Sequence, residues 1–108
     1  MKLKRQNRKF KVGISNITLN EVAKLSLKSN EMVTFLSGRN EYDIVKKNWG
    51  YYATPSINSR LLKFNFQTCL IKSLITKNKF ILLVQKNKKK EFNKYLKDEK
   101  LKILKWLS

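Results

Sequence analysis

The chain has 108 residues, and 25 Lys and Arg against 7 Asp and Glu give it a net charge of +18 at neutral pH. It contains no histidine and one cysteine, so the commonest general base and the usual zinc ligands are missing, which argues against most enzyme classes. Because 42% of the residues are hydrophobic, the chain is too apolar to be intrinsically disordered. Composition therefore favours a small folded, non-enzymatic protein without a cofactor, whose surface suits a polyanion.

The charge has a compositional explanation beside the functional one. Lysine provides 21 of the 25 basic residues, and the chain also holds 11 asparagines. Lys, Asn and Ile share A/T-rich codons, so nucleotide bias alone could load exposed positions with lysine. Specific phosphate recognition more often uses Arg forks than Lys. The +18 charge is thus either functional or compositional drift.

The first segment, residues 1–11, is strongly basic, with Leu3 and Phe10 as its apolar anchors. We expect a flexible basic arm here, followed by a single α+β domain over residues 12–108. Such an arm would contact phosphate groups through charge alone. Its basic residues are Lys2, Lys4, Arg5, Arg8, Lys9 and Lys11.

From Val12 onward, short β-rich segments alternate with turn residues. Leu25 and Leu27 alternate with polar residues, and strands are expected over Met32–Leu36 and Tyr42–Val45. The turn signals Ser29-Asn30 and Ser37-Gly38-Arg39-Asn40 separate these runs. The first half therefore reads as a β-meander.

Thr54-Pro55 predicts the start of a helix, because Thr can cap and Pro suits the first helical position. Ile57, Leu61 and Phe64 then share one helical face. Strands are expected over 66–72 and 80–85, joined by a turn at 76–78. A helix that Asn87 caps and that ends near Asp98 should follow, and then a last strand over 101–107. From Tyr42 the order is β-α-β-β-α-β, so we predict an α+β, ferredoxin-like antiparallel sheet with two helices on one face.

The uncharged segment 48–59 is the first candidate site. It contains Trp49, Tyr51 and Tyr52, with cations at its edges, and aromatic faces beside cations can stack bases or sugars. The alternative is that these rings close the end of the sheet. Helix N-terminal amides near Thr54 would also favour an anion. The polar and basic residues assigned to this site are Lys46, Lys47, Asn58 and Arg60.

The second candidate site is the lysine cluster at the start of the expected second helix. Lysines in a first helical turn oppose the positive end of the helix dipole, so a bound anion would explain them. A solvated run of charge is the alternative. The cluster consists of Lys86, Lys88, Lys89 and Lys90.

Catalytic and metal-binding interpretations are weak. Cys69 lies in an apolar strand, where a thiol is usually an inert core residue. Glu41 and Asp43 share a strand face and are expected to be solvated. The chain has no Gly-rich phosphate loop, no zinc spacing and no nucleophile elbow.

The leading hypothesis is a non-enzymatic module that binds a polyanion, RNA in preference to DNA, through the lysine clusters and the aromatic segment. One alternative is a protein-interaction or accessory subunit that docks through residues 48–59. Another is a site for an anionic sugar or nucleotide near Trp49 and Arg60. The longest apolar run, Phe80–Val84, is too short to span a bilayer, and a lone cysteine suits a reducing compartment, so a cytoplasmic location is expected.

Overall fold

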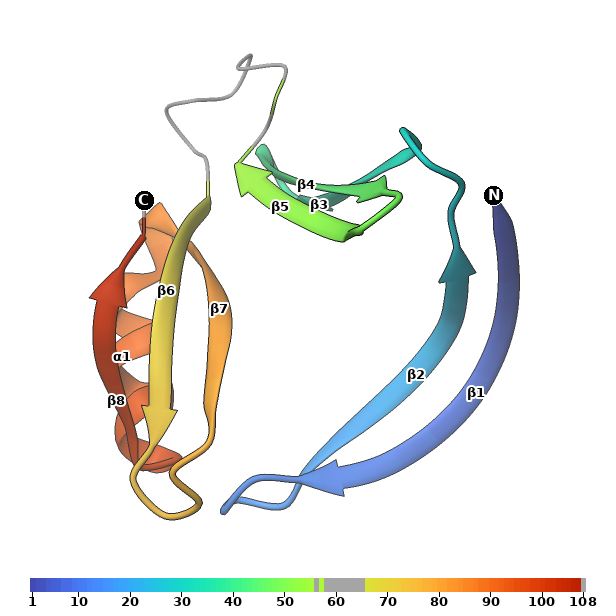
Figure 1. Ribbon diagram of the computed structural model, residues 1–108. Helices are drawn as coiled ribbons and strands as arrows, with labels where there is room; N and C mark the ends of the chain where they lie inside the picture. Colours follow the sequence, from blue (N-terminus) through green and yellow to red (C-terminus); the bar gives the residue numbers. More distant parts are fainter. Residues whose placement is uncertain (56, 58–65, 108) are drawn as a thin grey trace.

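The structure is a computed structural model that describes residues 1–55, 57 and 66–107. In these residues the backbone forms three small antiparallel sheets and one α-helix. The sheets are arranged around a central opening, with the hairpin of residues 2–26 on one side and the sheet that carries the helix on the other (Figure 1). No helix in this part of the chain has the length and apolar character needed to cross a membrane.

The first sheet is a long hairpin of β1 (Lys2–Val12) and β2 (Ile17–Ser26). Its turn uses Gly13 and Asn16 at φ 78° and 52°, conformations that glycine and asparagine adopt most readily. A register shift between Arg5 and Arg8 marks a β-bulge, which bends a strand and increases its twist. The hairpin accordingly follows a curve along one side of the opening (Figure 1).

The second sheet contains β3 (Met32–Ser37), β4 (Asn40–Lys47) and β5 (Gly50–Pro55) in chain order. Gly38, at φ 58°, makes the tight turn from β3 to β4. Pro55 suits the end of β5, because proline has no N–H to continue the ladder.

The third sheet has the order β7-β6-β8, formed by β6 (Phe66–Ser73), β7 (Lys79–Gln85) and β8 (Leu101–Trp106). The 3-10 turn η2 (Lys86–Lys88) and helix α1 (Lys89–Asp98) connect β7 to β8, and α1 covers one face of the sheet. The strand nearest the opening is β7 (Figure 1).

The main hydrophobic core lies between this sheet and α1. Cys69 and Ile71 of β6 are fully buried there with Val84 of β7 and Phe92 of α1. Alternate residues of a strand share a face, so Cys69 and Ile71 both point toward the helix. Phe92 meets the Trp106 ring edge-on at 5.9 Å between centroids, a favourable aromatic arrangement.

Polar side chains join the second and third sheets. The hydroxyls of Tyr42 and Thr68 lie 2.9 Å apart and are buried. Nearby, the Asn40 side-chain amide donates a hydrogen bond to Gln85 Oε1 at 2.8 Å. Tyr42 also contacts the Phe66 ring edge-on at 6.1 Å. These contacts hold β4 against β6 and against the end of β7.

The hairpin is attached to the rest of the chain at both of its ends. At the turn, Glu99 Oε1 accepts the Ile14 N–H at 2.9 Å, while Oε2 accepts the Ser15 N–H at 3.1 Å and the Ser15 hydroxyl at 2.6 Å. At the other end, the Met1 ammonium lies 3.1 Å from Glu31 Oε1. We call the Glu99 contacts the clasp, because they close the arrangement of sheets into a ring.

The expected ferredoxin-like α+β fold is wrong. The described chain is mainly β, with three small sheets and one short helix, rather than one sheet covered by two helices. Thr54 and Pro55, expected to start the first helix, are the last residues of β5. Apart from Ile57, the remainder of that expected helix lies outside the described residues. The neighbouring Tyr51-Tyr52 pair favours a strand, and it prevails over the capping signal.

Other expected elements agree better with the structure. The β6–β7 hairpin, the second expected helix and the last strand are all present. Asn87 lies in η2 and does not cap α1, whose N-cap is Lys88 without a side-chain cap hydrogen bond. Residues 2–11, expected as a flexible arm, are instead paired with β2 as strand β1.

Candidate polyanion-binding surface

The register of the first hairpin separates its side chains by type. Residues directly opposite each other in an antiparallel pair share a face, and the bulge between Arg5 and Arg8 preserves this separation along β1. One face, the lysine face, carries Lys2, Lys4, Lys9, Lys11 and Lys24. The other, the apolar face, carries Leu3, Phe10, Val12, Ile17, Leu19, Ala23 and Leu25.

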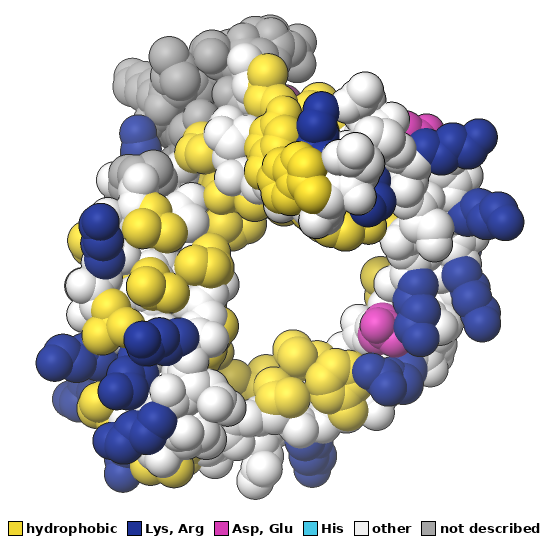
Figure 2. All heavy atoms as spheres, in the orientation of Figure 1, with side chains coloured by type: hydrophobic (Ala, Val, Ile, Leu, Met, Phe, Trp, Pro, Cys, Tyr) yellow, Lys and Arg dark blue, Asp and Glu magenta, His cyan; other side chains and the backbone are white. Residues whose placement is uncertain are grey.

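The lysine face points away from the central opening. Figure 2 shows Lys and Arg side chains along the outer side of the hairpin and apolar side chains around much of the opening, with an acidic side chain on the hairpin's side of it. Lys4 and Lys24 lie directly opposite each other, which is unfavourable for the hairpin unless an anion lies between them. An open hollow of about 650 Å³ is lined there by Lys2, Leu3, Lys4, Lys24 and Ser26. This hollow is the most concentrated positive site of the hairpin.

The two arginines of the expected basic arm lie on the opposite face from its lysines. Arg8 Nε is 3.4 Å from Glu21 Oε1, and its guanidinium lies 4.9 Å from the Phe10 ring centroid. Gln6 also donates a hydrogen bond to Glu21. Arg5 lies opposite Ala23. The site residues expected in segment 1–11 therefore divide between two faces.

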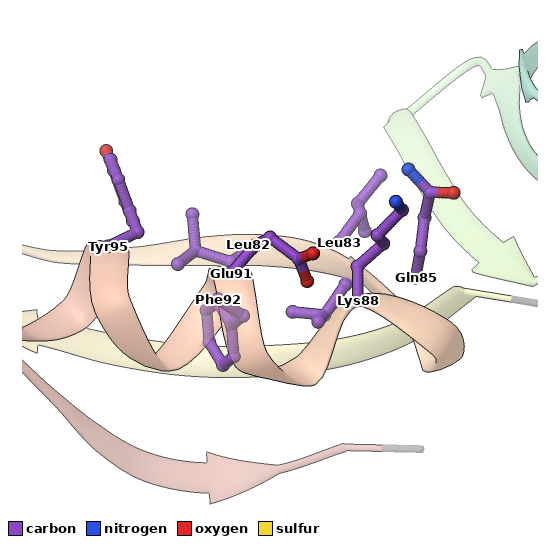
Figure 3. Close-up of a pocket in the computed structure, with 8 residues that line it drawn as sticks. Leu82, Leu83, Gln85, Lys88, Glu91, Phe92 and Tyr95 are labelled. Carbon is purple, nitrogen blue, oxygen red and sulfur yellow. The ribbon is translucent and has the colours of Figure 1, made fainter.

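The second expected cluster, Lys86–Lys90, does not form one surface. Lys89 turns toward the core, with its Nζ 3.5 Å from the Trp106 ring centroid, and burial lowers its pKa. Lys88 lines a groove of about 370 Å³ between β7 and α1. Figure 3 shows the Lys88 side chain on the same side of this groove as Gln85 and Glu91. Lys86 and Lys90 remain exposed.

The expected aromatic platform is also divided. Tyr51 and Tyr52 are successive residues of β5, so their side chains point to opposite faces of the sheet. Lys46 Nζ lies 5.0 Å from the Tyr51 ring centroid, whereas Lys47 Nζ donates a hydrogen bond to Asn30 Oδ1 at 2.6 Å. Trp49, at the β4–β5 turn, is 69% exposed. Asn58 and Arg60 lie outside the described residues.

The lysine face includes a residue that the sequence reading missed. Lys24 was not assigned to any site, although it lies directly opposite Lys4. The signal was present in the alternation of Lys24 with Ala23 and Leu25, typical of a strand with one polar face. Such a local pattern does not show which distant segment a strand pairs with, so it could not reveal that Lys4 lies opposite Lys24.

Two carboxylates have structural roles. Asp43, expected to be solvated, is buried and accepts hydrogen bonds from the Thr34 hydroxyl and the Ile57 N–H, each at 2.6 Å. In the clasp, the Ser15 hydroxyl and then the backbone amides hold the pKa of Glu99 below its usual value. Among the described residues, no group of three or more acidic, His or Cys side chains is placed to hold a metal ion.

The cysteine is shielded rather than activated. Cys69 is completely buried in the core, and this burial raises the pKa of its thiol despite an opposing effect from Lys89. A raised pKa reduces the thiolate fraction that would attack a substrate. The environment is that of a core residue.

No protein-family model matches the chain, and neither a curated protein nor a solved structure matches it.

Proposed function

We propose that this protein is a small non-enzymatic module that binds a polyanion, RNA in preference to DNA, through the lysine face of the β1–β2 hairpin. The observation that carries the proposal is the separation of charge on this hairpin. Lysines occupy one face, whereas the other face carries the apolar residues together with Arg5, Arg8 and Glu21. On the lysine face, Lys4 lies directly opposite Lys24.

Codon bias would raise lysine content everywhere, and the third sheet also carries a row of like charges, with Lys72 opposite Lys79 and Lys102. The Lys4–Lys24 pair differs in that it lines an open hollow together with Lys2.

The spacing of the lysine face suits a chain of phosphates. Alternate residues of a strand lie about 6.7 Å apart, so Lys2 with Lys4, and Lys9 with Lys11, present ammonium groups in an extended row. A row of this kind matches a repeating anion better than a single small one. The face carries lysines and no arginine fork, so it would contact phosphates and read little of the base sequence.

Unpaired bases are the reason for favouring RNA. The exposed Trp49 ring would add stacking on a single-stranded partner, worth about 1 to 3 kcal/mol per base. Single-stranded RNA presents such bases in loops and ends. Duplex DNA hides its base faces and could not stack on Trp49. Its major groove nevertheless accepts a two-stranded β-ribbon, so the test below includes duplex DNA.

The test is a titration of labelled single-stranded RNA, duplex DNA and heparin at several salt concentrations. Each phosphate neutralised on a single strand contributes about −0.7 to the slope of log affinity against log salt. The double substitution Lys4→Gln/Lys24→Gln should therefore reduce the slope by about 1.4 and weaken binding about tenfold or more at low salt.

The matched control is Lys97→Gln/Lys105→Gln, which removes the same charge from exposed positions of α1 and β8. It should change the slope much less. Equal losses in both variants would mean that binding follows net charge and not the hairpin. Heparin binding as tight as RNA binding would remove the preference for RNA, and no binding at physiological salt would leave the lysines as compositional drift.

A protein partner is the second candidate, and exposed Trp49 is the observation that favours it. Tryptophan is enriched among residues that dominate protein interfaces, and Trp49 belongs to the uncharged sequence segment 48–59. Trp49→Ala should then abolish capture of a protein partner while leaving the salt slope for RNA unchanged. Loss of RNA affinity without loss of capture would assign Trp49 to the nucleic acid instead.

A further inference from the structure

The apolar face of the β1–β2 hairpin is only partly covered by the part of the chain that the structure describes. Five of its side chains, Leu3, Phe10, Val12, Leu19 and Leu25, remain between 38% and 48% exposed. Polar contacts hold the hairpin to the rest of the chain at its two ends, in the clasp and at Met1. An isolated two-stranded hairpin is at best marginally stable in water. The hairpin therefore requires a partner surface.

Other apolar side chains border the same opening. Phe35 and Tyr51 of the second sheet line a hollow of about 250 Å³ with Leu25 of the hairpin. At the other end, Val12 lines a larger hollow of about 550 Å³ with Phe80 and residues near the clasp. Figure 2 shows apolar side chains on several sides of the central opening. The uncovered surface is thus continuous with both sheets rather than confined to the hairpin.

The whole molecule is more open than a monomer of its mass should be. Its accessible surface is 8116 Å², whereas the size relation for folded monomers gives about 6,300 Å² for 12.8 kDa. The radius of gyration is 15.3 Å, against about 13 Å expected for this length. The surplus of about 1,800 Å² per chain exceeds the roughly 800 Å² that each partner buries in a standard interface. Two chains would together bury about 3,600 Å², which falls in the range of obligate dimers.

We propose that the surface around the opening, including the apolar face of the hairpin, is an interface with a second copy of this chain. The face must be covered for the hairpin to be stable, so its cover has to be present whenever the chain folds, and a second copy meets that condition. The lysine face points the other way, so dimerisation through the apolar face leaves these five charges in water. Arg5, Arg8 and Glu21 share the apolar face and would lie at the interface, where Arg8 is paired with Glu21. This inference is independent of the proposed RNA binding, which uses the opposite face.

Salt gives the dimer a distinctive behaviour. Each copy carries +18, and the repulsion between two such copies is screened as ionic strength rises. Self-association should therefore tighten, by at least about tenfold, between about 50 mM and 0.5 M salt. RNA binding through lysine should weaken over the same range, so the two proposals fail separately.

The experiment is sedimentation equilibrium of the full chain across protein concentration and salt. We expect a species of twice 12.8 kDa. Leu19→Glu places a charge on the apolar face and should abolish the dimer, whereas Val22→Glu on the lysine side of the same strand should leave it intact. Both residues are exposed in the single chain, at 43% and 64%, so a monomeric protein would tolerate both equally.

Hydrogen exchange of the unmodified protein covers the case in which Leu19→Glu does not fold. Amides of β1 and β2 should be protected at a concentration where the dimer is present and should lose protection on dilution. A monomer at every concentration and salt would overturn the proposal and leave the face to a different partner. Equal dimer loss in Leu19→Glu and Val22→Glu, or hairpin protection that is independent of concentration, would also overturn it.

Discussion

At the scale of single residues, the clasp depends on a glycine as much as on its carboxylate. A Cβ at Gly13 would lie 2.0 Å from Glu99 Oε1, and φ there is 78°. Gly38 also has a positive φ, of 58°, but has open space around it. An added Cβ would therefore strain the backbone at both positions, but only at Gly13 would it also collide with the Glu99 carboxylate.

Gly13→Ala should destabilise the protein more than Gly38→Ala. Both variants should lose about 1 kcal/mol from the left-handed backbone, but only Gly13→Ala should also displace the Glu99 carboxylate from its donors. Urea unfolding of the two variants measures the difference. Equal losses in the two variants would show that the clasp contributes nothing to stability.

The clasp also predicts how stability changes in acid. The pKa of Glu99 is lowered in the folded chain, so its contribution is full above the unfolded pKa of about 4.5 and is lost as pH falls through the lower folded value. Glu99→Gln should flatten the fall in stability in this acid range. Glu91→Gln, at an exposed position of α1, is the control and should keep the wild-type dependence on pH.

Cys69 should react slowly with thiol reagents. Its side chain is fully buried and burial raises its pKa, so the reagent must wait for an opening of the core. If that opening costs about 3 kcal/mol or more, modification is slowed by at least about a hundredfold relative to the unfolded chain. The rate of modification with and without urea measures this factor, and similar rates would contradict the burial.

Residue type alone could not predict these roles. Cys69 was correctly placed in a core strand, because the apolar residues around it carry that information. Asp43 and Glu99 look like solvated carboxylates in the sequence, yet both are buried against donors from distant segments. Pairings across 85 residues, as between Ile14 and Glu99, leave no local pattern.

At the scale of elements, the sequence predicted the third sheet and its helix well. The pattern of β6 and β7 is local, and Phe92, Tyr95 and Leu96 mark the face of α1 at helical spacing. The strand β1 was missed because its lysines suggested solvation and its bulge interrupts the alternation of charged and apolar residues. The strand β5 was missed because Thr54-Pro55 resembles a helix start.

Lys24→Glu should stabilise the hairpin and weaken polyanion binding at the same time. The substitution replaces two like charges in a direct cross-strand pair with opposite charges, worth about 0.2 to 1 kcal/mol. Thermal unfolding at low salt, together with RNA titration, measures both effects. A rise in stability without loss of affinity would exclude the hollow beside Lys4 as the anion site.

The third sheet should carry most of the stability of the single chain. Ile71→Ala removes a fully buried side chain from the core and should reduce the free energy of unfolding by about 2 to 5 kcal/mol. Leu36→Ala, on β3 and 69% exposed, should change it by less than about 0.5 kcal/mol. Comparable losses would mean that the second sheet has a cover that the single chain does not provide.

At the scale of the whole molecule, the two faces of one hairpin give opposite responses to salt. The lysine face makes RNA binding weaker with added salt, while the apolar face makes self-association tighter. A saturating polyanion should therefore promote the dimer at low salt, because it neutralises the lysine faces of both copies. Sedimentation at low salt with and without heparin tests this, and dissociation of the dimer by heparin would contradict it.

The clasp also sets an order of events during synthesis. The hairpin turn at Ile14 leaves the ribosome long before Glu99, its partner 85 residues later, has been translated. At about 5 to 20 residues per second, this interval lasts about 4 to 17 seconds. Once it has left the ribosome, the nascent hairpin has its apolar side chains in water and one end unattached until Glu99 is available. A chaperone that recognises exposed apolar strands would therefore meet this hairpin before the clasp forms.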